Sequence, residues 1–219
     1  MISLDQKPSK YSFYIYGAGG HGKVVLEAAL SENYPVKGFL DDDSNKWNRK
    51  IANYPVFGNI NYFDSLDKKE IRIIVAIGDN TLRQSKVFEF KEKGLKFQSV
   101  IHGKALVSTF SSLGEGSMVI AGAIINIDTF IGDHVIINTG ATVDHDCLIQ
   151  DFVHIAPGVH MGGEVQVGEG TLVGIGSVVK PGVKIGAWSI IGAGAVVTSN
   201  IPDRVVAVGV PARVIREIK

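Results

Sequence analysis

The chain has 219 residues, 45% of them hydrophobic, and this length allows one or two domains with buried cores. Lysine plus arginine balances aspartate plus glutamate at 22 each, so no overall positive field favours nucleic acid as a partner. The first ten residues are polar, and no later apolar run reaches the roughly 20 residues that span a bilayer. We therefore expect neither a signal peptide nor an integral membrane segment. The single cysteine, Cys147, cannot form an internal disulfide, which fits the cytoplasm.

Predicted strands and helices alternate in the first half. Apolar runs predict strands at residues 12–16, 36–40 and 71–77, with helices predicted at 23–31 and 81–93. This alternation is typical of a small parallel α/β sheet. Composition then changes near residue 105, where aromatic residues thin out and Gly, Val and Ile dominate. The change predicts a second domain.

A glycine-rich loop joins the first predicted strand to the first predicted helix. Gly17, Gly19 and Gly22 have the G-x-G-x-x-G spacing, and Asp41 follows Gly22 by nineteen residues. This spacing matches the dinucleotide fingerprint, in which a helix N-terminus offers amides to phosphate. The loop also lies at the carboxyl edge of parallel strands, where such sheets bind ligands. The residues alone leave NAD, a nucleotide sugar and a purely structural turn open.

The second half repeats with a period of six residues. Every sixth residue from Val107 to Val197 is aliphatic or Met, sixteen positions without a slip, and the residue four places after each is nearly always small or β-branched. Helices repeat near 3.6 residues and plain strands at 2, so this period predicts a solenoid of short parallel strands with tight corners. The period leaves the handedness open.

These hexads, followed by Val208-Gly-Val-Pro-Ala-Arg213, resemble the hexapeptide-repeat acyltransferases, whose fold is a left-handed parallel β-helix. Tyr16–Lys23, Leu40–Asp42 and Ala76–Asn80 extend the resemblance to a subfamily. That subfamily contains nucleotide-amino-sugar N-acetyltransferases and sialic acid O-acetyltransferases.

The resemblance implies a small Rossmann-like domain at 1–104 that binds a nucleotide sugar, and a left-handed β-helix acyltransferase domain with a C-terminal tail at 105–219. It implies a cytoplasmic enzyme of bacterial glycan or polysaccharide biosynthesis, which transfers acetyl from acetyl-CoA to a nucleotide-linked amino sugar without a metal. O-acetylation of a sugar or of sialic acid is the alternative.

The resemblance also implies two groups of binding residues. The residues expected to bind the nucleotide sugar are Gly19, Gly20, His21, Asp41, Asp42 and Gly78. The residues expected to bind acetyl-CoA are His154, Gly163, Ile175 and Ala193. A strand-ending turn is the structural alternative for the two aspartates, and a tight solenoid corner for Gly163.

Acyl transfer to an amine or hydroxyl needs a base, and neutral imidazole suits this role at pH 7. The solenoid offers four histidines, and chemistry alone does not choose between them: His134, His145, His154 and His160. The resemblance places the catalytic base at His145, with Asp146 assisting it. Neighbours on an extended strand point to opposite faces, so Asp146 reaches the ring only if the backbone bends, and Asp144 is a rival. Cys147 occupies a small-residue position and is interpreted as a packed core thiol.

Two other functions are compatible with a β-helix. A γ-class carbonic anhydrase would hold zinc with three histidines, but this chain lacks that histidine spacing. A non-enzymatic sensing or scaffold subunit would not need His145 and His154. The resemblance further implies a homotrimer with acetyl-CoA bound between subunits. Outward apolar residues are predicted to supply the subunit contact, namely Ile120, Ile124, Ile136 and Leu148.

Overall fold

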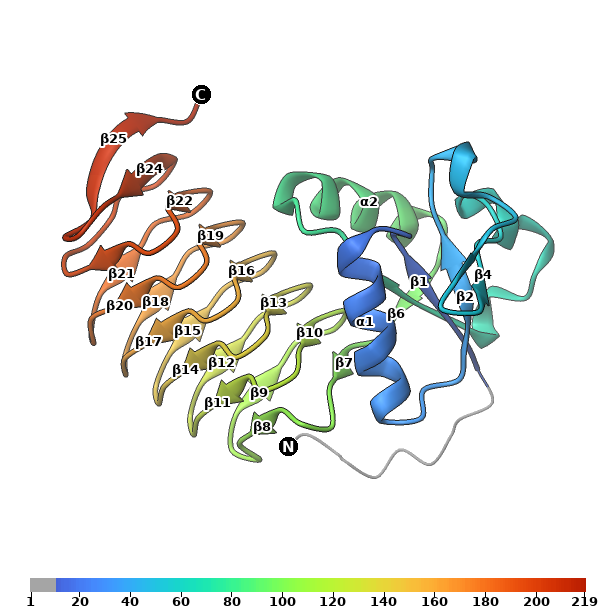
Figure 1. Ribbon diagram of the computed structural model, residues 1–219, viewed down its shortest axis with the longest axis horizontal. Coiled ribbons are helices and arrows are strands. Elements are labelled where there is room, and N and C mark those ends of the chain that lie inside the picture. Colours follow the sequence, from blue (N-terminus) through green and yellow to red (C-terminus); the bar gives the residue numbers. More distant parts are fainter. Residues whose placement is uncertain (1–10) are drawn as a thin grey trace.

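The structure is a computed structural model that describes residues 11–219 (Figure 1). The first ten residues, on which the expectation about a signal peptide rests, lie outside this range. Within residues 11–219, no helix combines the length and apolar character needed to cross a membrane. A sheet with two flanking helices comes first, and a solenoid then extends away from it to the C-terminus (Figure 1).

The first part is a four-stranded parallel sheet with strand order β2-β1-β5-β6. Its strands are β1 (Ser12–Tyr16), β2 (Val36–Leu40), β5 (Ile71–Val75) and β6 (Lys96–Phe97), and its helices are α1 (Gly20–Ser31) and α2 (Asn80–Glu92). All five predicted elements are therefore confirmed. Helix α1 begins three residues before its predicted start. Glycine has a poor helix propensity, so the composition of its first turn hides the helix from sequence analysis.

The segment between β2 and β5 folds locally and was not predicted. It contains the hairpin of β3 (Lys50–Ile51) and β4 (Tyr54–Pro55), and the 3₁₀ helices η1 (Ser44–Lys46), η2 (Ile60–Ser65) and η3 (Lys68–Glu70). Each 3₁₀ helix follows an Asp or Asn whose side chain accepts a hydrogen bond from a backbone N–H two residues on, as in Asp43 to Asn45 at 3.0 Å.

The solenoid has three faces of stacked two-residue strands. The first face contains β7 (Val100–Ile101), β10 (Met118–Val119), β13 (Ile136–Ile137), β16 (His154–Ile155), β19 (Leu172–Val173) and β22 (Ile190–Ile191). The second contains β8 (Leu106–Val107), β11 (Ile124–Ile125), β14 (Thr142–Val143), β17 (His160–Met161), β20 (Val178–Val179) and β23 (Val196–Val197). The third contains β9 (Ser112–Leu113), β12 (Phe130–Ile131), β15 (Leu148–Ile149), β18 (Gln166–Val167) and β21 (Lys184–Ile185).

Each strand pairs in parallel with the strand one coil later, as in Met118 with Ile136, so one coil is three hexads. This arrangement confirms the predicted solenoid and is consistent with a left-handed β-helix. The hydrogen bonding of the solenoid already begins at β7, where Val100 pairs with Met118. The division of the chain at residues 104 and 105 stays a prediction about domains.

The hexad pattern has a direct packing meaning. The second residue of each strand points inward, and the small or β-branched residue four places later is buried at a corner in all sixteen hexads. Buried hydroxyls at these corners are satisfied by carbonyls, as where Ser117 Oγ donates to Gly132 O at 2.9 Å. The register therefore holds because a slip would bury polar groups and expose the aliphatic core.

The first face of the solenoid packs against the N-terminal part of the chain. Met118 and Ile136 are fully buried in one apolar cluster with Val25 and Ala29 of α1. Burial of each large side chain contributes about 1.5–3 kcal/mol. The prediction that Ile120 and Ile136 face a partner subunit was therefore wrong, because this chain itself covers them.

The C-terminal residues extend the first face. Strand β24 (Val205–Val208) pairs in parallel with β22, and β25 (Arg213–Glu217) returns antiparallel to β24. The five residues of β25 are all exposed. The expected C-terminal tail is thus a hairpin that ends the stack of coils.

Candidate active site

The glycines of the loop between β1 and α1 have two different roles: two of them allow close packing, and two leave the backbone open to a ligand. Gly17 has φ +110° and a Cβ there would lie 2.7 Å from Ala76 O, while a Cβ on Gly22 would collide with Gly17 O. These two positions therefore require glycine. A Cβ on Gly19 or Gly20 would meet nothing within 4 Å. The predicted ligand-binding glycines thus lie open at the N-terminus of α1, where backbone amides favour an anion.

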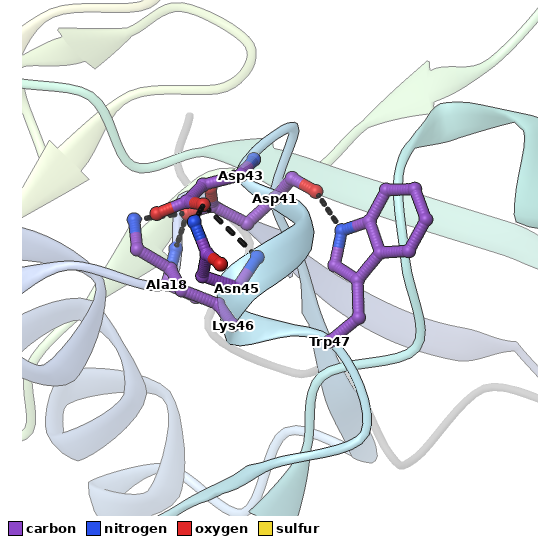
Figure 2. Close-up of polar contacts among 6 residues, drawn as sticks. All are labelled: Ala18, Asp41, Asp43, Asn45, Lys46 and Trp47. Carbon is purple, nitrogen blue, oxygen red and sulfur yellow. Dashed lines mark hydrogen bonds and ion pairs between the residues drawn. The ribbon is translucent and has the colours of Figure 1, made fainter.

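Asp41 ties this loop to the segment that follows β2 (Figure 2). Its Oδ2 accepts hydrogen bonds from Ala18 N at 2.8 Å and Lys46 Nζ at 2.9 Å, and its Oδ1 accepts from Asp43 N at 2.9 Å. The Trp47 indole N–H donates to Asp41 O at 2.7 Å. Burial by itself would raise the pKa of Asp41, but the hydrogen bonds outweigh it and lower the pKa. The carboxylate therefore stays charged and organises the loop.

The other acidic residues near the loop have different partners. Asp42 is exposed, and its carboxylate lies 2.7 Å from Lys86 Nζ of α2. Asp79 caps α2 by accepting a hydrogen bond from Leu82 N at 2.8 Å. Asp42 is thus the more accessible of the two predicted acidic contacts for a nucleotide. Its binding role stays a prediction, as do those of Asp41 and Gly78.

His154 lies where the two parts of the chain meet. Its Nδ1 is 3.2 Å from Gly78 O and its Nε2 is 3.1 Å from Asn138 Nδ2, and its ring centroid lies 6.2 Å from that of His21. The structure thus brings together a residue predicted to bind acetyl-CoA and two predicted to bind the nucleotide sugar.

The hydrogen bonds assign the tautomer of His154. Thr139 N donates to Asn138 Oδ1 at 2.8 Å, so the amide NH₂ of Asn138 faces the imidazole and Nε2 must accept. Nδ1 then carries the proton and donates it to Gly78 O. Burial lowers the pKa of His154 to about 3 and, with Arg83 adding to the effect, that of His21 to about 4. Both rings are therefore neutral at pH 7, and His154 is poorly placed to act as a base.

His145 has the opposite environment. It is exposed, and its Nδ1 lies 2.7 Å from Asp146 Oδ2. That hydrogen bond raises the pKa of His145. Asp146 has φ +58°, so the backbone makes the bend that the carboxylate needs to reach the ring. Asp144 instead accepts from His145 N at 2.9 Å and from Asn126 Nδ2 at 2.7 Å, and these contacts favour Asp146 as the group that orients the imidazole.

The remaining predicted residues occupy two different corners of the prism. Gly163 lies one coil beyond His145 at the second corner, between the second and third faces, and a Cβ on Gly163 would lie 2.5 Å from His145 Cε1. Ile175 and Ala193 are exposed at the first corner, between the first and second faces. They lie on successive coils, where Gly194 N donates to Ile175 O at 2.8 Å. One chain therefore does not join these two residues to His145 on a single corner.

Two further observations concern side-chain chemistry. Cys147 is 2% exposed, and burial raises the pKa of its thiol to about 11, which confirms a packed core thiol. Within residues 11–219, no group of three or more His, Cys, Asp or Glu side chains is arranged to hold a metal ion.

Sequence analysis did not single out Asn138 as a partner of His154. An asparagine at a solenoid corner gives no signal of its own.

Comparisons with known proteins identify the family of this chain. Residues 12–90 match the family described as the PglD N-terminal domain, and residues 164–199 match the bacterial transferase hexapeptide family (six repeats). A histidine-to-alanine variant of GDP-perosamine N-acetyltransferase from Caulobacter crescentus, in complex with CoA and GDP-perosamine, is 40% identical over 97% of this chain and 100% of that chain, with a TM-score of 0.89. The chain belongs to the hexapeptide-repeat sugar acetyltransferases.

Other members of this family are also similar along nearly their whole lengths. The acetyltransferase domain of PglB from Neisseria gonorrhoeae, in complex with acetyl coenzyme A, is 35% identical over 94% of this chain and 100% of that chain, with a TM-score of 0.88. WeeI from Acinetobacter baumannii is 27% identical over 94% of this chain and 100% of that chain, with a TM-score of 0.86. As a hexapeptide-repeat sugar acetyltransferase, the chain is an acyltransferase.

Proposed function

We propose that this acyltransferase transfers acetyl from acetyl-CoA to the amino group of a nucleotide-linked amino sugar in bacterial glycan or polysaccharide biosynthesis. The relative with GDP-perosamine and CoA bound supports the substrate class, at 40% identity over almost the whole chain. The observation that carries the mechanism is the 2.7 Å contact between His145 Nδ1 and Asp146 Oδ2 on an exposed corner of the solenoid.

The proposed reaction is a direct attack. The Nδ1–H of His145 donates to Asp146, which leaves Nε2 unprotonated and able to accept a proton from the sugar amine. The amine nitrogen forms a bond to the thioester carbon, the C–S bond breaks, and the CoA thiolate leaves and takes up the proton that His145 accepted from the amine. The products are the N-acetyl sugar and CoA. No acyl-enzyme is required, in agreement with the burial of Cys147.

We assign the nucleotide diphosphate to the open amides of Gly19 and Gly20, beside His21 and Asp42. Two observations support this: both glycines leave space above the backbone, and the helix N-terminus attracts anions. We assign acetyl-CoA to a groove that includes Ile175 and Ala193. His154 joins the two sites through its contact with Gly78.

The quaternary structure that we propose is a homotrimer. Within one chain, His145 and the Ile175–Ala193 wall lie on different corners of the prism, so a complete site requires the corner of one subunit to meet a different corner of the next. Cyclic packing of three prisms would build three such sites. Exposed apolar residues near these corners support the contact: Phe110, Ile127, Phe130 and Val178. We also propose a cytoplasmic location, which the lack of any second cysteine for an internal disulfide supports.

The function is tested by incubating the purified protein with acetyl-CoA and a panel of UDP- and GDP-linked amino sugars, while free CoA thiol is measured. We expect thiol release with at least one amino sugar, and a product heavier by one acetyl group. The matched control is the same nucleotide sugar with a hydroxyl in place of the amine. Equal turnover of the hydroxyl compound would contradict N-acetylation and favour the O-acetyltransferase alternative.

A further inference from the structure

Helix α2 docks along the third corner of the solenoid, which is the edge between the third and first faces. Asn80 Nδ2 donates to Gly170 O at 2.9 Å, and Arg83 donates from Nη2 to Phe152 O at 2.7 Å and from Nε to His134 O at 3.0 Å. These three carbonyls lie at equivalent positions of successive coils, because each is separated from the next by one coil of three hexads. Helix α2 therefore forms hydrogen bonds to equivalent carbonyls of three successive coils, and these bonds fix the position of the N-terminal part of the chain along the solenoid.

Arg83 is the central residue of this contact and has an unusual environment. Its side chain is 0% exposed, and within residues 11–219 it forms no salt bridge with a carboxylate. Its guanidinium also donates from Nη1 to Ile77 O at 2.9 Å, so it reaches three separate chain segments. Burial lowers the pKa of Arg83 to about 9. Burying a cation without a salt bridge is costly, and the carbonyl dipoles together with the nearby charge of Asp79 offset part of that cost.

Two of the segments that Arg83 joins lie on either side of the hydrogen bond between His154 and Gly78. Ile77 directly precedes Gly78, and Phe152 precedes His154 by two residues. The guanidinium thus fixes both sides of the hydrogen bond between His154 Nδ1 and Gly78 O. Its fork has the reach and geometry to serve three carbonyls at once, whereas a lysine ammonium is a compact point charge.

We propose that Arg83 is a positioning residue of the active site, which holds the Gly78 loop and the His154 strand in register without touching either substrate. This inference rests on the proposed function for its kinetic consequence only. The structural part, that Arg83 keeps His154 bonded and buried, can be measured with no substrate present.

The structural test follows the ring of His154 by NMR in histidine-labelled protein, with the signal assigned by comparison with His154→Gln. The charged or titratable groups that face this ring are His21 from α1 and Arg83 from α2. In the wild-type protein we expect the ring to remain neutral from pH 8 to pH 5. In Arg83→Lys, which keeps the charge and loses the fork, we expect its pKa to move toward the ordinary value of about 6.5.

The kinetic test uses the same variant well below its melting temperature. A displacement of about 1 Å at a reacting centre is enough to reduce turnover by about 10², so we expect kcat/KM for the sugar nucleotide to fall at least about tenfold in Arg83→Lys. The matched control is Gln84→Ala, which removes a neighbouring contact of α2, the 2.8 Å hydrogen bond to Glu169, and is expected to stay within about twofold of the wild type.

The outcomes separate positioning from mere stabilisation. A lower melting temperature with an unchanged His154 titration and unchanged kcat/KM would overturn the proposal. So would a His154 ring that titrates above pH 5 in the wild-type protein, and this measurement stands even if Arg83→Lys does not fold. Failure of every sugar nucleotide to react would count against the proposed function, while the NMR result would still decide the role of Arg83.

Discussion

His145 and His154 show how local contacts give two histidines different chemistry. His145 is exposed and its hydrogen bond to Asp146 raises its pKa, whereas burial lowers the pKa of His154 to about 3. A general base must take up a proton during the reaction, and only the first environment favours the protonated ring. The geometry therefore agrees with the choice of His145, which the histidine spacing alone could not make.

Replacing His145 tests its role directly. We expect His145→Ala to lower kcat by about 10² or more, because a positioned general base contributes about 10²–10⁴ in rate. The side chain is exposed, so the melting temperature should not change. His160→Ala, another exposed histidine of the solenoid, serves as the control and should keep normal turnover. Near-normal turnover in His145→Ala would remove this residue from the mechanism.

The pH dependence tests the partner of the base. The carboxylate of Asp146 raises the pKa of His145, so activity should rise with pH through a midpoint above the ordinary value of about 6.5. In Asp146→Asn the midpoint should move to lower pH and the maximal rate should fall, because the imidazolium loses its charged partner. Asp144→Asn should shift the midpoint less. A larger shift in Asp144→Asn would reverse the assignment of the two carboxylates, as seen in profiles of kcat/KM.

The buried ring of His134 should make the free energy of unfolding depend on pH. It is fully buried, neither ring nitrogen has a hydrogen-bond partner within residues 11–219, and burial lowers its pKa to about 3. In the unfolded chain the His134 imidazole takes up a proton near pH 6.5, whereas in the folded chain it stays neutral down to about pH 3. The contribution of His134 to the free energy of unfolding is therefore complete above pH 6.5. It falls by about 1.4 kcal/mol for each pH unit below that value.

We expect His134→Phe to reduce this acid sensitivity and to add about 1–3 kcal/mol at pH 7, because it removes unsatisfied polar atoms. Phe152 occupies the equivalent corner one coil later at φ +57°, so the corner accepts phenylalanine at the φ +56° of His134. Urea unfolding at pH 7 and pH 5 measures both effects, with His160→Gln as a control that should change neither. An undiminished loss of stability at pH 5 in His134→Phe would contradict this account.

At the scale of elements, the glycine loop separates binding from folding. Gly20→Val adds a side chain where a Cβ meets nothing within 4 Å, so the fold should persist. The added methyl groups would block the approach of phosphate to the backbone. We expect the Kd for the sugar nucleotide to rise at least about tenfold and the Kd for CoA to stay within about twofold, as measured by calorimetry. Equal weakening of both ligands would contradict the two-site assignment.

Gly22→Ala is the matched variant for this loop. A Cβ on Gly22 would collide with Gly17 O, so the whole turn between β1 and α1 must shift. We expect this smaller substitution to lower the melting temperature more than Gly20→Val does. The opposite order would show that the loop packs differently from the structure.

The elements that could be predicted are those whose signal is local and repeated. A period of six residues fixes which residues of every coil point inward, and a strand followed by G-x-G-x-x-G fixes the first turn of the sheet domain. The docking of α2 could not be predicted, because Arg83 in a charged helix resembles a solvent-exposed residue. The covering of Ile136 by α1 and the bend at Asp146 were also hidden, because the first depends on residues distant in the sequence and the second on a backbone angle that no local pattern encodes.

At the scale of the whole molecule, the three corners of the solenoid carry different parts of the proposed site and of the contact with α2. The third corner receives α2, the second carries His145 and Gly163, and the first carries Asn138, Ile175 and Ala193. The first face is covered by the N-terminal part of the same chain, so it is not free for a partner over the coils that contain Met118 and Ile136. The proposed second subunit would therefore contact the surfaces around the first and second corners, where the two halves of the proposed site are exposed.

Mixing two inactive variants tests whether the site is shared between subunits. His145→Ala removes the base and keeps the acetyl-CoA wall, while Ala193→Trp obstructs the wall at an exposed turn and keeps the base. Gly163 is unsuitable for the second variant, because a side chain there would displace His145 in the same chain. In trimers formed at random from equal amounts of both chains, about a quarter of the interfaces would combine an intact base with an intact wall. Doubly tagged hybrids exclude both homotrimers and have one such interface in three, so we expect co-expressed hybrids to recover about a third of wild-type activity, with each variant alone nearly inactive. No recovery in verified hybrids, or full activity of a monomer in dilute sedimentation and kinetic measurements, would place the complete site within one chain.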